Sequence, residues 1–515
     1  MEIKIQKILY IFCSFIAGFS VMVVELISSR IVAPMIGSSV FTWTSVIGIT
    51  LLGLSLGSFI GGKIADKAEK MKPLPLAFLV SSILVFIITI LMKKVNLIIN
   101  SSNSILILNL LISSYLFLLP AISIGTIQPI ILKKYADDFS KIGSKYGTLS
   151  AIWSLGSILG VFLTGFIFIS TIGSMETIWF ISSILFITGL ALTIRENKKN
   201  LLIFLVALFF LLAYFLYAKA STNVGTNVIF QKETNYYDAR VVDSYIPGFG
   251  NSRILFLDFD SHSIQATETN EFFYTEMYPV FSYMKENIKD ILVVGAGAYT
   301  MPEHFKDYYK NSTVSVIDID PEIEKIGKKY FGLDKYDIKT TTGDARLILK
   351  NDEKKYDLIF GDAYNSFVSV PWYLLTEEYN KIIKDRLNDN GIYAVNFIGS
   401  MTGPNSNFTK SVLDTFKISF PNFYIFSFGA DTSSVQNVVL VGIKGNLPIN
   451  EEGLHQKISK GKNSFLADKI TDEVLLANSS STILTDDFSP VEKLMTPIMK
   501  EYFPEHLIFN KNYGN

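Results

Sequence analysis

A series of apolar runs in the first part of the chain gives way to a more polar sequence. Seven runs are long enough, or nearly long enough, to span a bilayer: 8–27, 39–61, 76–92, 105–132, 148–170, 175–193 and 200–217. Acidic residues are sparse among them and become common only after about residue 230. The pattern predicts a polytopic transmembrane domain of about seven α-helices over residues 1–217. The small and polar residues 218–228 are typical of a linker.

Beyond the linker, short apolar runs alternate with polar segments, which is typical of an α/β domain. Residues 291–294 and 356–360 have the composition of buried parallel strands, and residues 313–320 form a third apolar run that ends in acids. We therefore expect a small β-rich module over 229–288. A Rossmann-like, methyltransferase-type domain with a mostly parallel sheet should follow over 289–515, with the strands at 291–294 and 356–360 side by side or near each other.

The ends of these predicted strands carry the residues of a candidate nucleoside site. Gly295 and Gly297 follow the first strand directly, where backbone can approach a ligand closely. Asp318 ends the second strand, 23 residues after Gly295, near the spacing at which an acid binds ribose hydroxyls. Asp344 follows the third strand and Asp362 the fourth. Because ligands of open parallel sheets bind at the carboxyl ends of the strands, we expect these side chains to share one site.

The charge of this site limits its ligand. It has three acids and no phosphate-cradling lysine, and the chain contains no GxxxxGK[ST] motif. An uncharged nucleoside attached to a cationic group fits this pattern.

Composition excludes several other kinds of chemistry. The net charge is −1 and no basic patch with interleaved aromatic residues occurs, so we expect no nucleic acid partner. The single cysteine, Cys13, lies in the first apolar run, and the four histidines lack ligand spacing. We therefore predict no metal site and no disulfide.

With 49% hydrophobic residues and a mean hydropathy of +0.34, the chain is too apolar for a wholly soluble protein, and the lipid bilayer is an expected partner.

The order of these motifs resembles one enzyme family. GAGA (295–298), VIDIDPEIEKIGKKYF (316–331), GDARLIL (343–349) and YDLIFGDAY (356–364) together resemble the spermidine synthases, or polyamine aminopropyltransferases. Two upstream segments, 230–243 and 255–279, resemble the small β-domain and substrate-facing segment of that family, so that the likeness spans about 226–445. LTDDFSPVE (484–492) resembles a closing motif of its membrane-fused branch.

The resemblance implies a membrane-bound aminopropyltransferase. Such an enzyme transfers an aminopropyl group from decarboxylated S-adenosylmethionine, a co-substrate, to an amine such as putrescine, and releases methylthioadenosine without a prosthetic group. It also implies roles for individual residues. Asp318 would bind the ribose, Asp344 with the adjoining Ala345 the adenine, and Asp362 would be the general base. The residues implied to bind the polyamine substrate are Tyr236, Gln265, Tyr274 and Tyr364.

Two departures from the family pattern leave the reaction open. Soluble spermidine synthases have an aspartate in the first turn, where this chain has Ala298, and a second acid after the fourth strand, where it has Asn365. A different acceptor or donor is one consequence. The alternatives are an S-adenosylmethionine-dependent methyltransferase and a non-catalytic nucleoside or polyamine sensor or transporter.

The sequence places the chain in the cell membrane as a multi-pass protein but gives conflicting signs of its orientation. Basic residues concentrate near the N-terminus and in alternate loops, which predicts that these are cytoplasmic. Seven spans would then put residues 218–515 outside the cytoplasm. Decarboxylated S-adenosylmethionine is a cytosolic metabolite, however, which favours the cytoplasmic side. Polyamine and adenosyl small molecules are the expected ligands, and a homo-oligomer is compatible with the sequence.

Overall fold

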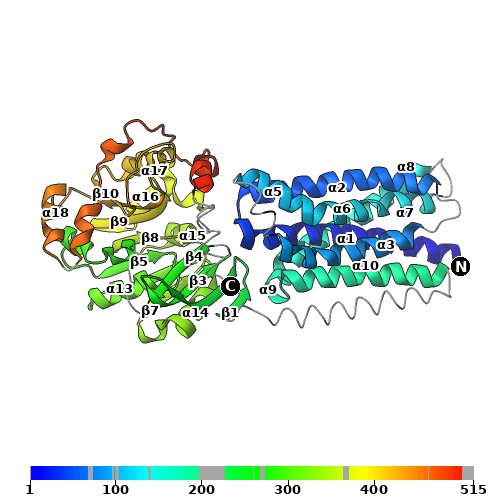
Figure 1. Cartoon of the computed structure of the whole chain (residues 1–515), viewed down its shortest axis with the longest axis horizontal. Helices are drawn as coiled ribbons and strands as arrows, with labels where there is room; N and C mark the ends of the chain where they lie inside the picture. The colour runs from blue at the N-terminus through cyan, green and yellow to red at the C-terminus, as the bar shows by residue number, and fades with distance from the viewer. Residues whose placement is uncertain are drawn as a thin grey trace. The chain divides into compact units, whose positions relative to one another are not determined.

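The computed structural model describes residues 2–67, 73–95, 98, 104–136, 141–196, 227–258, 260–266, 273–363, 370–461 and 463–501. The chain divides into two compact units, Met1–Thr226 and Asn227–Asn515 (Figure 1). The first unit is helical and the second contains both sheets. The predicted linker boundary at 218–228 stays a prediction, because residues 197–226 lie outside the described part of the chain.

The helical unit confirms the first six apolar runs as helices. Among the described residues, six stretches are long and apolar enough to cross a membrane: Ile5–Ile36, Val40–Lys67, Pro73–Leu91, Leu106–Tyr135, Ile142–Thr171 and Ser174–Arg195. The seventh predicted run, 200–217, lies outside the described residues. The described helices of this unit are α1 (Glu2–Ile36), α2 (Val40–Lys67), α3 (Pro73–Leu91), α5 (Ile105–Ser113), α6 (Leu119–Gly125), α7 (Ile127–Tyr135), α8 (Ile142–Leu163), α9 (Ile169–Thr171) and α10 (Ser174–Glu196).

Small residues allow close packing within the helical unit. Gly53, Gly57 and Gly61 recur every four residues along α2 and face α6 and α7. A Cβ at Gly57 would lie 2.2 Å from the carbonyl oxygen of Ile122, so that any larger residue would push the two helices apart. The stripe is therefore a packing surface between α2 and the helices α6 and α7.

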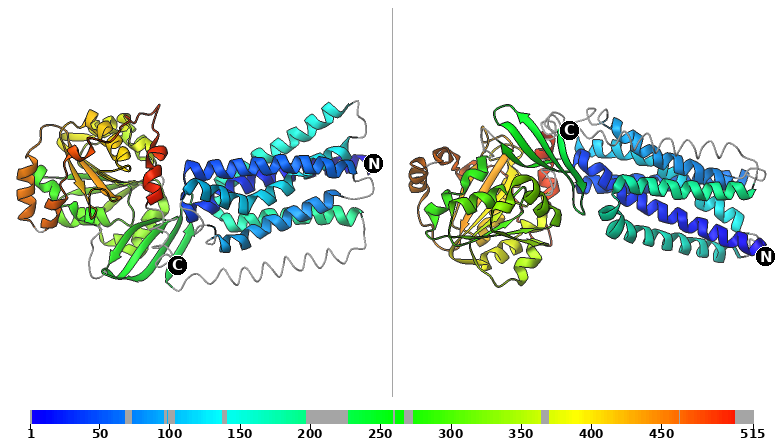
Figure 2. Two further views of the ribbon diagram at one scale, coloured as in Figure 1. Left: turned by 45° about the horizontal axis from the view of Figure 1, so that its top comes forward. Right: turned by 90° about the horizontal axis from the view of Figure 1, so that it is seen from below.

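The second unit begins with a small antiparallel sheet. Its four strands follow one another in space as in sequence, from β1 to β4. They are β1 (Val228–Glu233), β2 (Asp238–Ile246), β3 (Gly250–Leu257) and β4 (Asp260–Ala266). Figure 2 shows this sheet, in green, as a layer of its own beside a larger sheet.

The larger sheet has seven strands in the order β10-β11-β9-β8-β5-β6-β7. They are β5 (Asp290–Val294), β6 (Thr313–Asp318), β7 (Ile338–Thr342), β8 (Tyr356–Gly361), β9 (Leu387–Gly399), β10 (Phe423–Ser427) and β11 (Gln436–Ile443). Strands β5 to β9 are parallel, whereas β11 and β10 run antiparallel to their neighbours. Ile291 pairs with Leu358 in adjacent strands, which confirms the predicted neighbourhood of 291–294 and 356–360.

Helices cover both faces of this sheet, as its buried central strands β5 and β8 require. They are α12 (Val280–Met284), α13 (Thr300–Tyr308), α14 (Pro321–Ile326), α15 (Ala345–Asn351), α16 (Glu377–Asp385), α17 (Ser406–Ser419) and α18 (Glu451–Ser459). On one face Phe360 of β8 packs edge-on against Phe305 of α13. On the other face Tyr393 of β9 stacks on Phe416 of α17. The predicted fold class, a helical part followed by a mostly parallel α/β domain, is confirmed.

Candidate active site

A cavity of about 210 Å³ lies at the carboxyl ends of the parallel strands. The residues that end β5, β6 and β8 line it, together with residues 260–264 of β4 from the small sheet. The strand order reverses between β5 and β8, because the chain proceeds from β5 to β6 and β7 on one side and from β8 to β9 on the other. Open α/β sheets bind their ligands at such a switch point.

The turn after β5 brings its backbone close to the neighbouring elements. Gly295 has φ +90° and Gly297 φ +49°, which L side chains rarely adopt. A Cβ at Gly295 would lie 2.4 Å from the carbonyl oxygen of Asp362, and a Cβ at Gly297 2.6 Å from the Ser263 hydroxyl. Both glycines line the cavity. The turn therefore needs glycine for its backbone conformation and for the space around it.

Asp318, at the end of β6, is fixed by backbone donors. Its Oδ2 accepts the N–H of Ala296 at 2.9 Å, and its Oδ1 accepts the N–H of Asp320 at 2.9 Å. Burial raises the pKa of the Asp318 carboxyl to about 6, although these N–H groups oppose the rise. Each carboxylate oxygen has a second lone pair, so that Asp318 can still accept two ligand hydroxyls.

Asp344 and Ala345 lie at the start of α15, where both line the cavity. Asp344 caps this helix, because its side chain accepts the N–H of Leu347 at 3.0 Å. The cap holds the carboxylate at the helix N-terminus, beside the cavity wall.

Asp362, just after β8, is held at both carboxylate oxygens. The Tyr274 hydroxyl donates to Oδ2 at 3.0 Å and the Asn396 amide donates to Oδ1 at 2.8 Å. Burial raises the pKa of Asp362 to about 6, whereas the two donors favour the ionised form. Asp362, Tyr274 and Asn396 all line the cavity. A carboxylate with this pKa is a proton acceptor at neutral pH.

Asn396 and Asn437 were not among the candidate residues from the sequence. The Asn437 amide nitrogen donates to Asn396 Oδ1 at 3.1 Å, and this bond orients the Asn396 nitrogen toward Asp362. Both asparagines line the cavity from strands β9 and β11. One feature of the sequence could have pointed to Asn396: it is a single asparagine inside the apolar run 392–398. A polar side chain in a buried strand needs a hydrogen-bond partner, which suggests a role for it.

The other sequence candidates lie at varying distances from the cavity. Gln265 is exposed on β4, and Tyr236 is 39% exposed before β2; neither is among the cavity-lining residues. Burial and the nearby acids raise the pKa of Tyr236, with Asp320 contributing most among the charges.

Ala298 is buried and donates its N–H to the Ser263 hydroxyl at 2.8 Å. Tyr364 and Asn365 lie outside the described residues. The substrate contacts of Tyr236, Gln265 and Tyr364 stay predictions.

The charges on the cavity wall are all negative among the described lining residues. Four carboxylates line the cavity, and lysine and arginine are absent from that described set; the acids are Asp260, Asp318, Asp344 and Asp362. His262 also lines it, but burial lowers its pKa to about 4, so the ring is neutral. The described part of the chain contains no group of three or more His, Cys, Asp or Glu side chains that could hold a metal ion. The negative wall of the cavity therefore favours a cationic ligand.

The asparagine pair yields a testable pH dependence. Asn396→Leu preserves the side-chain shape and removes the donor to Asp362, so that the ionised carboxylate loses about 1.5–3 kcal/mol of support. The pKa of Asp362 should rise by roughly 1–2 units. If Asp362 must be ionised for turnover, the acid limb of the kcat/KM profile should move to higher pH by the same amount. An unchanged limb in a variant that still binds nucleoside would contradict this coupling.

Comparison with known proteins gives a consistent result. Residues 271–426 match the spermine/spermidine synthase domain. The chain is 27% identical over 228 residues to a probable polyamine aminopropyl transferase of Bifidobacterium longum, covering 41% of this chain and 50% of that protein. It is 26% identical over 216 residues to the polyamine aminopropyltransferase of Vibrio vulnificus, covering 40% and 69% respectively. The spermidine synthase structure from Thermotoga maritima aligns with 18% identity and a TM-score of 0.39, over 50% of this chain and 90% of that one. The first of these matches spans only half of the relative's length.

Proposed function

We propose, from the spermine/spermidine synthase domain at 271–426, that this protein is a polyamine aminopropyltransferase. The donor would be decarboxylated S-adenosylmethionine, the acceptor an amine such as putrescine, and the by-product methylthioadenosine. No prosthetic group is needed, because the sulfonium of the donor activates the carbon that is attacked.

The observation that carries this proposal is the charge of the cavity. The decarboxylated donor is a cation because it has a sulfonium and no carboxylate, and a polyamine acceptor is a cation as well. The described cavity wall has four acids and no lysine or arginine. Carboxylates bind ammonium groups through charge-assisted hydrogen bonds. The carboxylate of S-adenosylmethionine itself would have no cationic side chain to pair with among these residues, and like charges at one site repel.

The residues divide into a nucleoside end and a reaction end. Asp318 would accept the ribose hydroxyls, and Asp344 with Ala345 would contact the adenine beside the turn at Gly295 and Gly297. At the other end, the amine nitrogen attacks the methylene next to the sulfonium. The enzyme must hold these two atoms in line and remove a proton from the ammonium, so that a lone pair is available.

Asp362 is the proposed general base of this reaction. It lies in the cavity with a pKa of about 6, so it is mostly ionised at pH 7. Tyr274 and Asn396 fix both of its oxygens, which limits the orientations that the carboxylate can adopt. The aminopropyl group joins the nitrogen, the carbon–sulfur bond breaks, and its electron pair stays on the thioether sulfur of methylthioadenosine. The proton passes to Asp362.

The donor test separates this function from its alternatives. Purified protein is incubated with decarboxylated S-adenosylmethionine or with S-adenosylmethionine and a panel of amines, and products are separated by chromatography. We expect methylthioadenosine to form only from the decarboxylated donor with an amine. The preference should be roughly 10²-fold or more, because an unpaired carboxylate in an acidic cavity costs several kcal/mol.

Two other outcomes would contradict the proposal. Adenosylhomocysteine formed from S-adenosylmethionine would favour a methyltransferase. Binding of methylthioadenosine without turnover of any donor and amine would favour a sensor or a transporter.

The six apolar helices support a multi-pass location in the cell membrane. Six spans would place both ends of the helical unit on one side, and a seventh at 200–217 would place the α/β unit on the other. With seven spans, the basic loops and the cytosolic donor support opposite sides for this unit, whereas with six spans both support the cytoplasmic side. The side of the membrane and a homo-oligomeric state remain predictions.

A further inference from the structure

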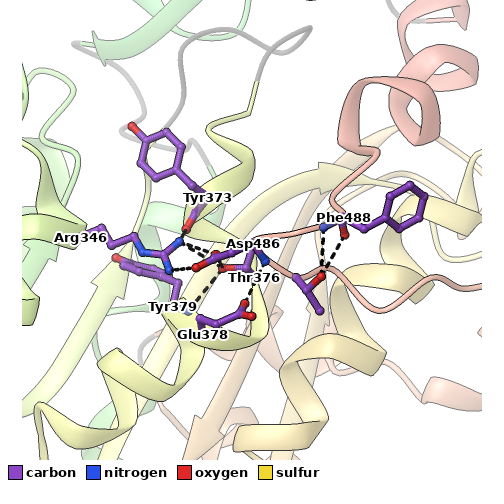
Figure 3. Close-up of polar contacts among 8 residues, drawn as sticks. Arg346, Tyr373, Thr376, Glu378, Tyr379, Asp486 and Phe488 are labelled. Atoms are coloured by element: carbon purple, nitrogen blue, oxygen red, sulfur yellow. Dashed lines mark hydrogen bonds and ion pairs between the residues drawn. The ribbon is translucent and has the colours of Figure 1, made fainter.

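The segment LTDDF (484–488) docks beside the candidate active site. Leu484 is fully buried; its N–H donates to the Thr415 hydroxyl at 2.9 Å, and its carbonyl accepts the N–H of Glu377 at 2.9 Å. Thr485 and Phe488 exchange backbone hydrogen bonds and close a tight turn. This turn presents Asp486 to helices α15 and α16 (Figure 3).

Asp486 forms a two-pronged ion pair with Arg346 of α15. One guanidinium nitrogen of Arg346 donates to Asp486 Oδ1 at 2.7 Å, and the other donates to Oδ2. The Thr376 hydroxyl donates to Oδ1 at 2.9 Å, and the Asp486 N–H donates to Glu378 at 3.1 Å. The pair lowers the pKa of Asp486 and raises that of Arg346, so both remain charged around neutral pH.

The same guanidinium reaches the backbone of the cavity wall. Arg346 also donates to the carbonyl of Tyr373 at 3.0 Å, in the short helix η8 (Trp372–Leu374). Tyr373 lines the cavity, as do Asp344 and Ala345, which directly precede Arg346 in the chain. One side chain thus joins two parts of the cavity wall that lie 27 residues apart in sequence.

We propose that Asp486 is a positioning residue for the nucleoside end of the cavity. It acts through Arg346, by holding the start of α15 and η8 at the separation that an adenosine group requires. This inference rests on the proposed function, because it assumes that the nucleoside occupies the end lined by Asp344 and Ala345.

The arrangement predicts an effect on binding rather than on the chemical step. Asp362 is held by Tyr274 and Asn396, and neither of these contacts Arg346 or Asp486 in the hydrogen bonds described. Asp486 is 40% exposed, and isolated exposed ion pairs contribute little to stability. Bidentate geometry and the bonds to Thr376 and Glu378 make this one more specific than a typical surface pair.

Asp486→Asn tests the proposal against a matched control. The substitution keeps the size and removes the charge, so that the fork of Arg346 loses one of its two acceptors. We expect the Kd for methylthioadenosine, measured by calorimetry on the full-length protein, to rise roughly 3- to 10-fold, equivalent to about 0.7–1.4 kcal/mol. KM for the donor should rise in parallel, with kcat nearly unchanged. Asp487→Asn makes the same charge change one residue later, outside the hydrogen bonds described, and should leave Kd and KM unaltered.

Further measurements separate positioning from a purely structural role. Asp486→Glu should recover most of the affinity, because it restores a carboxylate within reach of Arg346. A lower melting temperature with unchanged Kd and KM would overturn the inference, as would equal effects of the Asp486 and Asp487 variants. If the wild-type protein binds methylthioadenosine but Asp486→Asn binds it equally well, the inference fails alone. If the wild type binds no nucleoside, the proposed function fails first.

Discussion

Asp362→Asn is expected to lower the transferase rate by about 10²–10⁴, the usual cost of losing a general base. Asparagine keeps the size and one acceptor oxygen, so it can still receive a hydrogen bond from Tyr274 or Asn396, but it cannot take a proton. Affinity for methylthioadenosine should change little, because the proposed ribose and adenine contacts lie at Asp318 and Asp344. Steady-state turnover with the decarboxylated donor and calorimetric binding of methylthioadenosine measure the two effects separately.

The pH profile provides an independent check on this residue. Because burial raises the pKa of Asp362 to about 6, the wild-type kcat/KM should fall as the pH drops below about 6 and the carboxylate is protonated. Asp468→Asn removes a carboxylate that is 87% exposed and serves as the charge-matched control. A fully active Asp362→Asn enzyme would place the base elsewhere.

Asp318→Ala should weaken binding of adenosine-type ligands by about 2–4 kcal/mol, at roughly 1–2 kcal/mol for each of two charge-assisted bonds to the ribose. This corresponds to a loss in affinity of roughly 30-fold to 900-fold. The measurement is calorimetric binding of methylthioadenosine to the full-length protein.

The structure adds a complication to this second substitution. Asp318 also accepts the N–H groups of Ala296 and Asp320, so alanine would leave two backbone donors without their acceptor. Asp318→Asn is the more conservative variant, because it retains one acceptor oxygen while removing the charge; its loss should be smaller than that of alanine. Full affinity in both folded variants would remove the ribose contact from this position.

The sequence was sufficient to predict the parallel strands and the positions of the acids at their ends. Buried parallel strands are continuous apolar runs, and each acid follows its strand directly. Topology then requires that the carboxyl ends of β5, β6 and β8 meet, which brings Gly295, Asp318 and Asp362 to one cavity. These inferences depend only on local pattern and on the geometry of the sheet.

Contacts between distant segments could not be predicted in this way. Asn396 reaches Asp362 from β9, and Asn437 reaches Asn396 from β11, which is antiparallel to its neighbour. Their distances depend on strand order and register rather than on any motif. The contact between Asp486 and Arg346 is of the same kind, since 140 residues separate them. The role of an exposed residue such as Gln265 is also hard to predict from the sequence, because many residue types are tolerated equally well at an exposed position.

The contact between Gly295 and Asp362 restricts how this site can evolve. A Cβ at residue 295 would collide with the carbonyl of Asp362 and with the Cα of Ala363, 2.8 Å away. A mutation that reshaped the glycine turn for a new nucleoside would therefore also displace Asp362, the proposed general base. Tyr274 and Asn396 instead reach Asp362 through their side chains, so changes made at these two residues alter the surroundings of the carboxylate without reshaping the glycine turn. The proposed amine end of the site can thus change while the proposed nucleoside end stays intact.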